Sequence, residues 1–425
     1  MRQRVLAGLV CAAAVLAGSV ASSSPPPSVI SFTNYPLPAA LAHNGSASPI
    51  KVEPSIGANW KTGSIFLQGA LETDRLRFGS KGAAWEDVSS STTSTVTLDA
   101  VMVSDNATGR IFVSQLVAAT SLLAFSDNDG ETWSAALLGS GLPAGFDRQS
   151  IGVGPYPASG SAGPSGSYPH AVYYCAQQNV TAFCARSDNG GVSFGVSVPA
   201  YTFLDCGNLH GHMRVAPDGT IYLPNAQCQG SHGVSVSTDA GQTWKVRKVP
   251  GTTIGRTGQP GVGVGSDGTA YFGLADGDGK PKIAVSRDRG ATWSAPVDVG
   301  RQVGVQNAVF PTVIAGDGDR AAFAFLGTKT PGDSQTADFG MDASKTRYTG
   351  AEYHLYVATT FDRGRTWTTR DLTPNDPVQR GRICLGGSGC TGKDRNLLDF
   401  IDIQVDRNGR VLVGWADGCI GACVR

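Results

Sequence analysis

The sequence of 425 residues has no excess of either charge and no apolar run long enough to cross a membrane. Its 34 basic and 34 acidic residues cancel, and charged residues make up only 16% of the chain. Nucleic-acid-binding proteins usually present a basic face, and anionic membranes attract one. The balance of charge therefore argues against both kinds of partner.

The N-terminus has the pattern of an export signal. Two arginines within residues 1–4 precede an apolar run at 5–18, and small residues follow up to Ala21. The run is too short to span a bilayer, and Cys11 follows the large Val10, which argues against a lipid anchor at this cysteine. We expect a signal peptide over 1–21, a linker and ring-closing strand over 22–52, and a secreted protein, extracellular or periplasmic, with no stable membrane anchor.

The chain also lacks long helical periodicities and any pair of cysteines spaced CxxC. Glycine is frequent, with 56 residues, and short apolar segments alternate with turns, which is typical of an all-β chain. Nine cysteines less Cys11 leave eight, which fall into local pairs. In an exported protein this pattern predicts disulfides, with free buried thiols as the alternative. The expected pairs are Cys175–Cys184, Cys206–Cys228, Cys384–Cys390 and Cys419–Cys423.

One octapeptide recurs along the chain. Good copies are "SDNDGETW" (126–133), "SDNGGVSF" (187–194), "STDAGQTW" (237–244), "SRDRGATW" (286–293) and "TFDRGRTW" (360–367), and "FGSKGAAW" (78–85) is a degenerate one. Their final aromatic residues are 48, 61, 50, 49 and 74 residues apart. Insertions at 155–168 and 327–351 account for the two long steps. The underlying period of about 48 residues is that of a four-stranded propeller blade.

A second repeat, of two apolar strands joined by a tight turn, precedes each octapeptide, as in "MRVAPDGTIYLPN" (213–225). Seven such hairpins occur but only six octapeptides, and the last hairpin leads directly to the C-terminus. We therefore expect a β-propeller over 53–425 with seven blades, the last one closed by an N-terminal strand at 28–38. Six blades are the alternative.

The octapeptide is expected to form the turn between the third and fourth strands of a blade. Its Ser and Asp side chains can bond the turn backbone, its Gly can adopt a positive φ, and its aromatic ring can pack between blades. The octapeptide lacks the alternating oxygen ligands of a calcium loop, so the repeat predicts a folding device.

These octapeptides resemble Asp-boxes, also called bacterial neuraminidase repeats, and the chain from about 53 to its end resembles the sialidase superfamily of β-propellers. The resemblance implies hydrolysis of sialosides, with three arginines that bind the substrate carboxylate, a Glu-activated Tyr nucleophile and an Asp acid. In that family the first arginine precedes a proline motif near the start, whereas this chain has "YPLP" at 35–38. Asp-boxes also occur in propellers that only bind.

Polar residues precede the first strand of every predicted blade, where they would meet at a central channel. They include Glu53, Asp99, His210 and Asn307, and Asp399 with Asp402 before the last strand. We expect either a ligand-binding mouth or a hydrated structural channel. Candidate catalytic residues are Glu53, Asp147 and Asp399. Candidate substrate-binding residues are Arg148, His210, His212, Arg256, Gln259, Asn307 and Arg395.

Several alternatives accompany these candidates. His210 and His212 could bind a metal with a third ligand, although hydrogen bonding to a ligand is the favoured role, and we expect no metal and no cofactor. Glu352 and Tyr353 precede a middle strand, away from the channel. The insertion at 370–397, stiffened by a disulfide, is expected to cover the channel mouth. The function expected is a secreted, monomeric, sialidase-like glycoside hydrolase that acts on extracellular glycans, and the alternative is a propeller that binds a glycan or a protein without catalysis.

Overall fold

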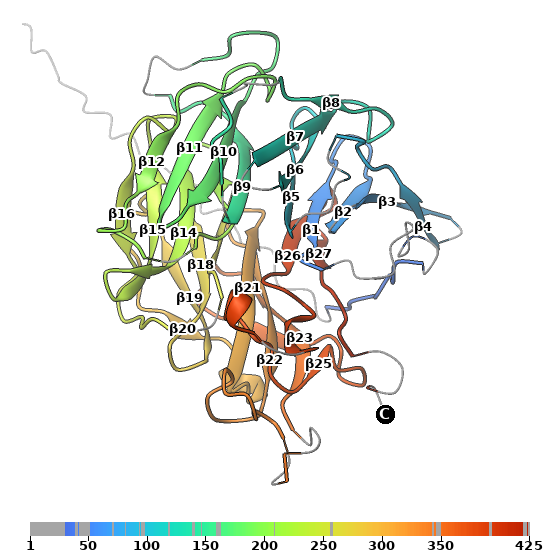
Figure 1. Ribbon diagram of the computed structural model, residues 1–425, viewed down its shortest axis with the longest axis vertical. Helices are drawn as coiled ribbons and strands as arrows, with labels where there is room; N and C mark the ends of the chain where they lie inside the picture. Colours follow the sequence, from blue (N-terminus) through green and yellow to red (C-terminus); the bar gives the residue numbers. More distant parts are fainter. Residues whose placement is uncertain are drawn as a thin grey trace, which may run out of the picture.

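The computed structural model forms a β-propeller without α-helices among the residues that it describes (Figure 1). These residues are 30–38, 41, 52–69, 72–80, 82–92, 94, 98–117, 120–137, 141–145, 147–158, 163–207, 209–255, 258–341, 344–345, 350–390, 393–419 and 423. The expected signal peptide at 1–21 lies outside them. None of the described segments is a helix of the length and apolar character that would cross a bilayer.

Among the described residues, five sheets have four antiparallel strands in simple up-and-down order, and a sixth has the same four strands with a fifth, short strand added. Blade 1 contains β1 (Ser55–Ala58), β2 (Ile65–Gly69), β3 (Glu72–Gly79) and β4 (Gly82–Asp87). Blade 2 contains β5 (Leu98–Ser104), β6 (Ile111–Val117), β7 (Thr120–Ser126) and β8 (Ser134–Ala135). Blade 3 contains β9 (Asp147–Gly154), β10 (Ala171–Gln178), β11 (Thr181–Ser187) and β12 (Val198–Tyr201).

The second half of the ring repeats this arrangement. Blade 4 contains β13 (Arg214–Val215), β14 (Ile221–Cys228), β15 (Ser231–Ser237) and β16 (Lys245–Lys248). Blade 5 contains β17 (Gly261–Val264), β18 (Ala270–Ala275), β19 (Pro281–Ser286) and β20 (Val297–Asp298). Blade 6 contains β21 (Asn307–Ala315), β22 (Ala321–Thr328), β23 (Glu352–Thr360) and β24 (Thr368–Asp371), and β25 (Gln379–Arg380) also pairs with β23. Short 3₁₀ turns are η1 (Arg301–Val303), η2 (Gly387–Gly389) and η3 (Lys393–Arg395).

The main expectation of seven four-stranded blades is wrong, and the alternative count of six is correct. The seventh hairpin forms a sheet of only two strands, β26 (Asp402–Val405) and β27 (Val411–Gly414). The first strands contact one another in the order β1, β5, β9, β13, β17, β21 and β26, and β26 contacts β1. The ring is therefore closed by this two-stranded sheet between blade 6 and blade 1.

The expected ring-closing strand is also wrong, because residues 30–38 have no strand structure and residues 28 and 29 lie outside the described part. The segment is nevertheless packed at the closure. Phe32 packs against the apolar cluster that includes Ile401 and Ile403, and the Tyr35 ring lies 5.1 Å from that of Phe78. Side-chain packing, rather than strand pairing, attaches the segment.

The octapeptide forms the third turn of blades 2 to 6, with the hydrogen bonds that its residue types predict. In blade 5, the Gly290 N–H donates to Ser286 Oγ at 2.9 Å, and the Thr292 N–H donates to Asp288 Oδ1 at 2.9 Å. Equivalent bonds recur in the other four copies. The residue before the glycine and the glycine itself both have positive φ, +59° and +74° in blade 5. The degenerate copy at 78–85 instead forms a plain hairpin in which Gly79 pairs with Gly82.

Each octapeptide glycine packs against the second strand of the preceding blade. A Cβ added to Gly290 would lie 2.9 Å from the ring of Tyr222, and the same position faces Phe66, Phe112, Tyr173 or Tyr271 at the other interfaces. Trp293 joins the cluster of Tyr222 and Phe272, which belong to blades 4 and 5. The repeat thus holds each blade against its neighbour as well as closing its own turn.

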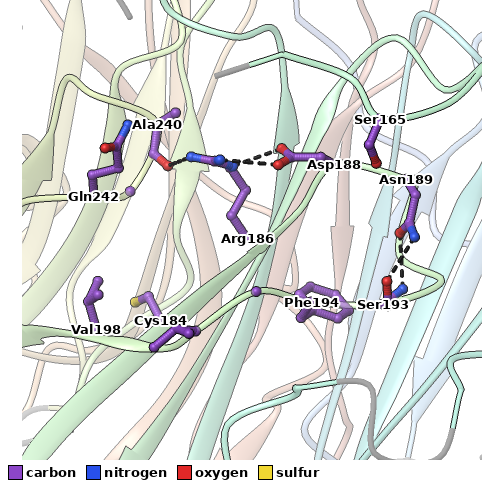
Figure 2. A pocket seen from close by; sticks show the side chains of 13 residues that line it. Ser165, Cys184, Arg186, Asp188, Asn189, Ser193, Phe194, Val198, Ala240 and Gln242 are labelled. Carbon is purple, nitrogen blue, oxygen red and sulfur yellow. Dashed lines mark hydrogen bonds and ion pairs between the residues drawn. The ribbon is translucent and has the colours of Figure 1, made fainter. Parts of the chain in front are cut away.

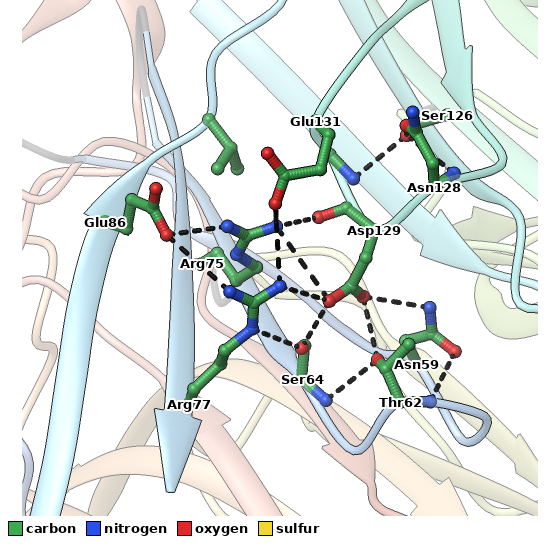
Figure 3. Close-up of polar contacts among 12 residues, drawn as sticks. Asn59, Thr62, Ser64, Arg75, Arg77, Glu86, Ser126, Asn128, Asp129 and Glu131 are labelled. Carbon is green, nitrogen blue, oxygen red and sulfur yellow. Dashed lines mark hydrogen bonds and ion pairs between the residues drawn. The ribbon is translucent and has the colours of Figure 1, made fainter.

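Between blades 1 and 2 a polar network adds to this contact (Figure 3). The carboxylate of Asp129, in the second blade's octapeptide, accepts hydrogen bonds from Asn59 and Thr62 of the first blade at 3.0 and 2.8 Å. The fully buried Arg75 forms ion pairs with Glu86 and Glu131 at 2.6 and 2.7 Å. Because a buried guanidinium needs such partners, this network is specific to one register of the two blades.

All four expected disulfides are present. Cys175 and Cys184 are directly opposite in β10 and β11, and Cys384–Cys390 lies within the insertion at 370–397. Bridges of this kind persist in oxidising compartments, which fits an extracellular or otherwise exported protein.

The packing of the octapeptide glycine predicts the effect of adding a methyl group there. Gly290→Ala combines a positive φ with a clash against Tyr222, and we expect a loss of roughly 2–4 kcal/mol of unfolding free energy. Gly268→Ala is the matched control, because φ is +82° but no atom lies within 4 Å of the added Cβ, and it should cost only about 1 kcal/mol. Denaturant unfolding measures both. Equal losses would contradict the proposed contact between blades.

Candidate functional site

Irregular backbone marks the starts of the first strands, at one end of the central channel. The ladders of β5, β9 and β21 each shift register there, and Asp99, Arg148 and Phe310 have φ of 60°, 48° and 56°. Glu53, just before β1, has φ of 50°. Left-handed backbone in residues other than glycine is costly and clusters at functional sites, and a β-bulge re-aims the side chain that it carries.

Arg148 is the centre of the site. It is 1% exposed although it carries a permanent charge. Its Nη1 lies 3.5 Å from Asp99 Oδ1, its Nη2 lies 3.9 Å from Asp399 Oδ2, and Nη2 donates to Gln259 Oε1 at 3.0 Å. The guanidinium also lies 5.0 Å from the centre of the Phe400 ring. One side chain therefore joins three other parts of the ring across the channel.

The three carboxyl groups of Glu53, Asp99 and Asp399 around Arg148 differ in the direction of their pKa shifts. Burial raises the pKa of Glu53 to about 8, and the charge of Asp99 adds to the rise. Burial also raises the pKa of Asp99 to about 6, against the opposing charge of Arg148. Burial opposes ionisation of Asp399 too, but hydrogen bonds from Arg395 and the charge of Arg148 outweigh it and lower its pKa. At neutral pH Glu53 is therefore protonated and Asp399 is ionised.

The contacts among these groups connect the first blade to the closing sheet. Glu53 Oε2 accepts the Asp99 N–H at 2.8 Å, and the Glu53 carboxyl is hydrogen-bonded to Asp399. Arg395 binds both oxygens of Asp399, at 2.6 and 2.8 Å. Arg395 stands near the end of the insertion 370–397, so this end of the insertion reaches the site. Asp147 is exposed beside the buried Arg148.

Blade 4 supplies histidine and arginine to the same region. The His212 ring lies 4.8 Å from that of Phe400, and His212 Nδ1 lies 3.8 Å from Asp402 Oδ1. Arg214 Nη2 lies 3.5 Å from the same oxygen. Asp402 also accepts hydrogen bonds from Ser55 Oγ at 2.9 Å and the Ile56 N–H at 3.2 Å. Asp402 is thus a structural link of the ring closure.

The channel beside Arg148 is narrow. A cavity of about 20 Å³ is lined by residues that include Arg148, His212, Arg214, Gln259 and Phe400. This volume suits about one water molecule. Within the described residues, Arg148 Nε, His212 Nε2 and Arg214 Nε have no hydrogen-bond partner. Polar atoms that can donate to a ligand therefore surround a space that admits only a small group.

Most of the expected site residues converge, and three do not join them in the described structure. Asn307 is turned to the insertion at 327–351, because its Nδ2 donates to the carbonyls of Thr330 and Gly332 at 2.8 and 3.0 Å. Arg256 lies outside the described residues. His210 is fully buried and its Nδ1 lies 2.9 Å from the Gly211 carbonyl oxygen, so it packs behind the channel wall.

A metal role for the two histidines gains no support from their surroundings. Burial lowers the pKa of His210 to about 3, so the ring is neutral, but it is fully buried and faces a backbone carbonyl. No group of three His, Cys, Asp or Glu side chains in the described part of the chain is arranged to hold a metal ion. Glu352 pairs with Arg380 on the sheet of blade 6, and the Tyr353 hydroxyl is buried, as expected for residues away from the channel.

Sequence reasoning did not identify Phe400, which packs on Arg148 and His212, or the degree to which Asp99 is buried. The sequence "DRNLLDFIDI" (394–403) contains Phe400 within an apolar run, where it looks like an ordinary core residue. Only the contact across the channel assigns it to the site.

Comparison with known proteins supports the fold and little more. No protein-family model matches the chain, and no curated protein matches it in sequence. Among solved structures, a GH74 enzyme of Niastella koreensis is 14% identical with a TM-score of 0.53, over 87% of this chain and 51% of that one. This chain therefore spans about half of that enzyme's length.

A fungal lectin is also similar. The Aleuria aurantia lectin, described as a six-bladed β-propeller with a novel mode of fucose recognition, is 13% identical with a TM-score of 0.46, over 75% of this chain and 95% of that one. At 14% identity the similarity to the GH74 enzyme is one of fold alone, and it does not show membership of the sialidase superfamily.

The raised pKa of Glu53 predicts how stability depends on pH. Between its ordinary value of 4.5 and about 8, the folded protein holds a proton that the unfolded chain releases, so the unfolding free energy falls as pH rises through this window. Glu53→Gln cannot ionise and its amide can make the same two hydrogen bonds. We expect the variant to equal the wild type near pH 4.5 and to exceed it by roughly 2–4 kcal/mol at pH 8.

Denaturant unfolding at pH 4.5 and pH 8 measures this difference. Asp376→Asn is the control, because Asp376 is exposed and its replacement should leave the pH dependence as in the wild type. Parallel curves for wild type and Glu53→Gln would show that Glu53 is ionised in the folded protein at neutral pH.

Proposed function

We propose that this protein is an exported glycoside hydrolase that cleaves a glycan at the mouth of its propeller channel. The observation that carries the proposal is the contact of two carboxyl groups, Glu53 and Asp399, beside the buried Arg148. Burial raises the pKa of Glu53 to about 8, whereas Arg395 and Arg148 lower that of Asp399. Pairs of carboxyl groups whose surroundings separate their pKa values mark acid and base roles in hydrolases.

The roles follow from exposure and charge. Glu53 is only 3% exposed, so its proton reaches the substrate through Asp399, which stands nearer the mouth. The pair donates this proton to the glycosidic oxygen as the bond to the anomeric carbon breaks. The exposed Asp147 accepts a proton from the water that attacks this carbon. The overall change is one water consumed and two hydroxyl groups formed, and solvent returns the proton to the pair.

The positively charged groups favour a neutral glycan over a sialoside. A sialidase grips the substrate carboxylate with free guanidinium groups, whereas Arg395 is bound through both oxygens of Asp399 and Arg148 is surrounded by carboxyl groups. A second anion here would compete with those carboxylates. The proposed substrate is therefore an uncharged sugar chain lying over the mouth, with the remaining donors of His212 and Gln259 available to its hydroxyl groups.

A non-catalytic role is the second candidate, and the size of the channel favours it. A cavity of about 20 Å³ does not admit a sugar ring, whereas sites for small organic ligands usually measure about 300–1,000 Å³. On this reading the mouth binds the surface of a glycan or a protein, and the strained carboxyl cluster stiffens the ring.

Turnover of a panel of fluorogenic glycosides separates the two candidates. For a hydrolase we expect the wild type to release fluorophore from a neutral glycoside. Glu53→Gln and Asp399→Asn should each reduce kcat/KM by at least about 100-fold, with KM changed little, and Asp376→Asn should not change it. The rate for the wild type should fall as pH rises above about 8, where Glu53 loses its proton.

Thermal unfolding must accompany these rates. Glu53→Gln is expected to be at least as stable as the wild type while losing turnover, which a merely structural residue would not produce. If no glycoside in the panel is hydrolysed by the folded protein but a glycan binds, the second candidate replaces the first. Full activity in both variants would remove this site from consideration.

A further inference from the structure

A larger cavity lies away from the channel, between blades 3 and 4 (Figure 2). Its volume is about 360 Å³, which falls in the range of small-molecule sites. Its walls come from the octapeptide turns of the two blades and the segment that follows the first of them. Ser165, from the insertion at 155–168, also lines the cavity, whereas none of the candidate catalytic or substrate-binding residues does.

The two walls differ in chemistry. Figure 2 shows Arg186 and Asp188 on one side of the cavity and Cys184, Phe194 and Val198 on the other. Arg186 Nε and Nη2 donate to the two oxygens of Asp188 at 2.8 and 3.1 Å. The pair is formally neutral and offers both donors and an acceptor.

The apolar side of the cavity continues onto the surface of the protein. Val196 lines the cavity and is 91% exposed, so its side chain is accessible to a ligand at the rim. Gln242, on the octapeptide of blade 4, is exposed at the opposite end, and its Nε2 donates only to the Asp239 carbonyl at 3.1 Å.

A related contact joins blades 2 and 3 from a different position, since Arg110 precedes the second strand of its blade whereas Arg186 lies on the third strand. Arg110 of blade 2 donates to the Gly190 carbonyl at 2.7 Å, as Arg186 donates to the Ala240 carbonyl at 2.9 Å, and both carbonyls belong to the residue before the octapeptide glycine. Between blades 2 and 3 the Tyr168 ring covers Arg110 at 4.5 Å, and its hydroxyl donates to Asp105 at 2.5 Å.

No aromatic ring covers Arg186 in the described part of the chain. The Tyr156 hydroxyl donates to Asp188 Oδ1 at 2.9 Å, yet a hollow of about 360 Å³ remains beside the Arg186–Asp188 pair. A ligand for this hollow needs hydroxyl groups to bond the charged pair and an apolar face to pack on Phe194 and Val198.

We infer that this inter-blade cavity binds one or two residues of a neutral saccharide, at a site separate from the channel mouth. The apolar C–H face of the sugar packs on Phe194, Val196 and Val198. Its hydroxyl groups donate to Asp188 and accept from Arg186 and Gln242, and charged partners make such hydrogen bonds stronger. The choice of a saccharide rests on the proposed function, and the site would retain the glycan while the channel mouth acts on it.

Isothermal titration and saturation-transfer NMR with methyl hexosides and soluble hexose oligosaccharides test this inference. We expect the wild type to bind at least one of these sugars. Gln242→Trp, which fills the cavity, and Asp188→Asn, which keeps the shape but removes the charge, should each weaken binding at least about tenfold. Ala291→Trp is the matched control, since Ala291 occupies the same octapeptide position in blade 5 and lines no part of this cavity, and it should bind as the wild type does.

The result is independent of turnover at the channel. Gln242→Trp should retain hydrolysis of a small fluorogenic glycoside, whereas Asp399→Asn should lose hydrolysis and retain binding. Binding without hydrolysis in the wild type would leave this site standing and overturn the proposed reaction. The inference is overturned if no sugar binds, if Gln242→Trp binds as tightly as the wild type, or if N-acetyltyrosinamide binds in preference to every sugar, which would indicate a peptide partner.

Discussion

The contact between each octapeptide glycine and the aromatic ring of the preceding blade is the constraint on which the rest of the structure depends. At Gly290 an added Cβ would lie only 2.9 Å from the Tyr222 ring, and the turn that keeps this glycine at positive φ is held by its own Ser and Asp side chains. Repetition of this contact fixes the rotation from blade to blade. The ring then brings the starts of seven first strands to one opening, although only six blades are complete.

At that opening the structure has features that lower its stability. Left-handed backbone at Glu53, Asp99 and Arg148 and a protonated carboxyl beside a buried guanidinium all cost free energy, and nothing in the packing of the blades requires them. The arginine contacts between blades differ from this strained region. Arg110 and Arg186 are paired, partly exposed and unstrained, and one of them borders a hollow large enough for a ligand. The proposed reaction site is thus identified by its strained backbone, and the proposed binding site by its cavity.

Much of the fold was predictable because its information is local. The four disulfides join cysteines that are close in sequence, and the turn of the octapeptide is made by its own residues, so both predictions were confirmed. The blade count was wrong because it depended on a long-range pairing. A hairpin pattern cannot tell whether residues 30–38 bond to β27 as a strand or, as observed, only pack their side chains nearby.

The candidate site was predictable only as a set of positions. The sequence by itself determined the repeat, the turns, the disulfides and the fact that polar residues precede the first strands, since all of these follow from residue type and spacing. Only the tertiary structure decided that Arg148 is buried among Glu53, Asp99 and Asp399 while Asn307 turns away, and that Phe400 belongs with them. The reason is physical. A β-bulge changes the face on which a side chain lies, and acidity depends on burial and on charges that come from other blades.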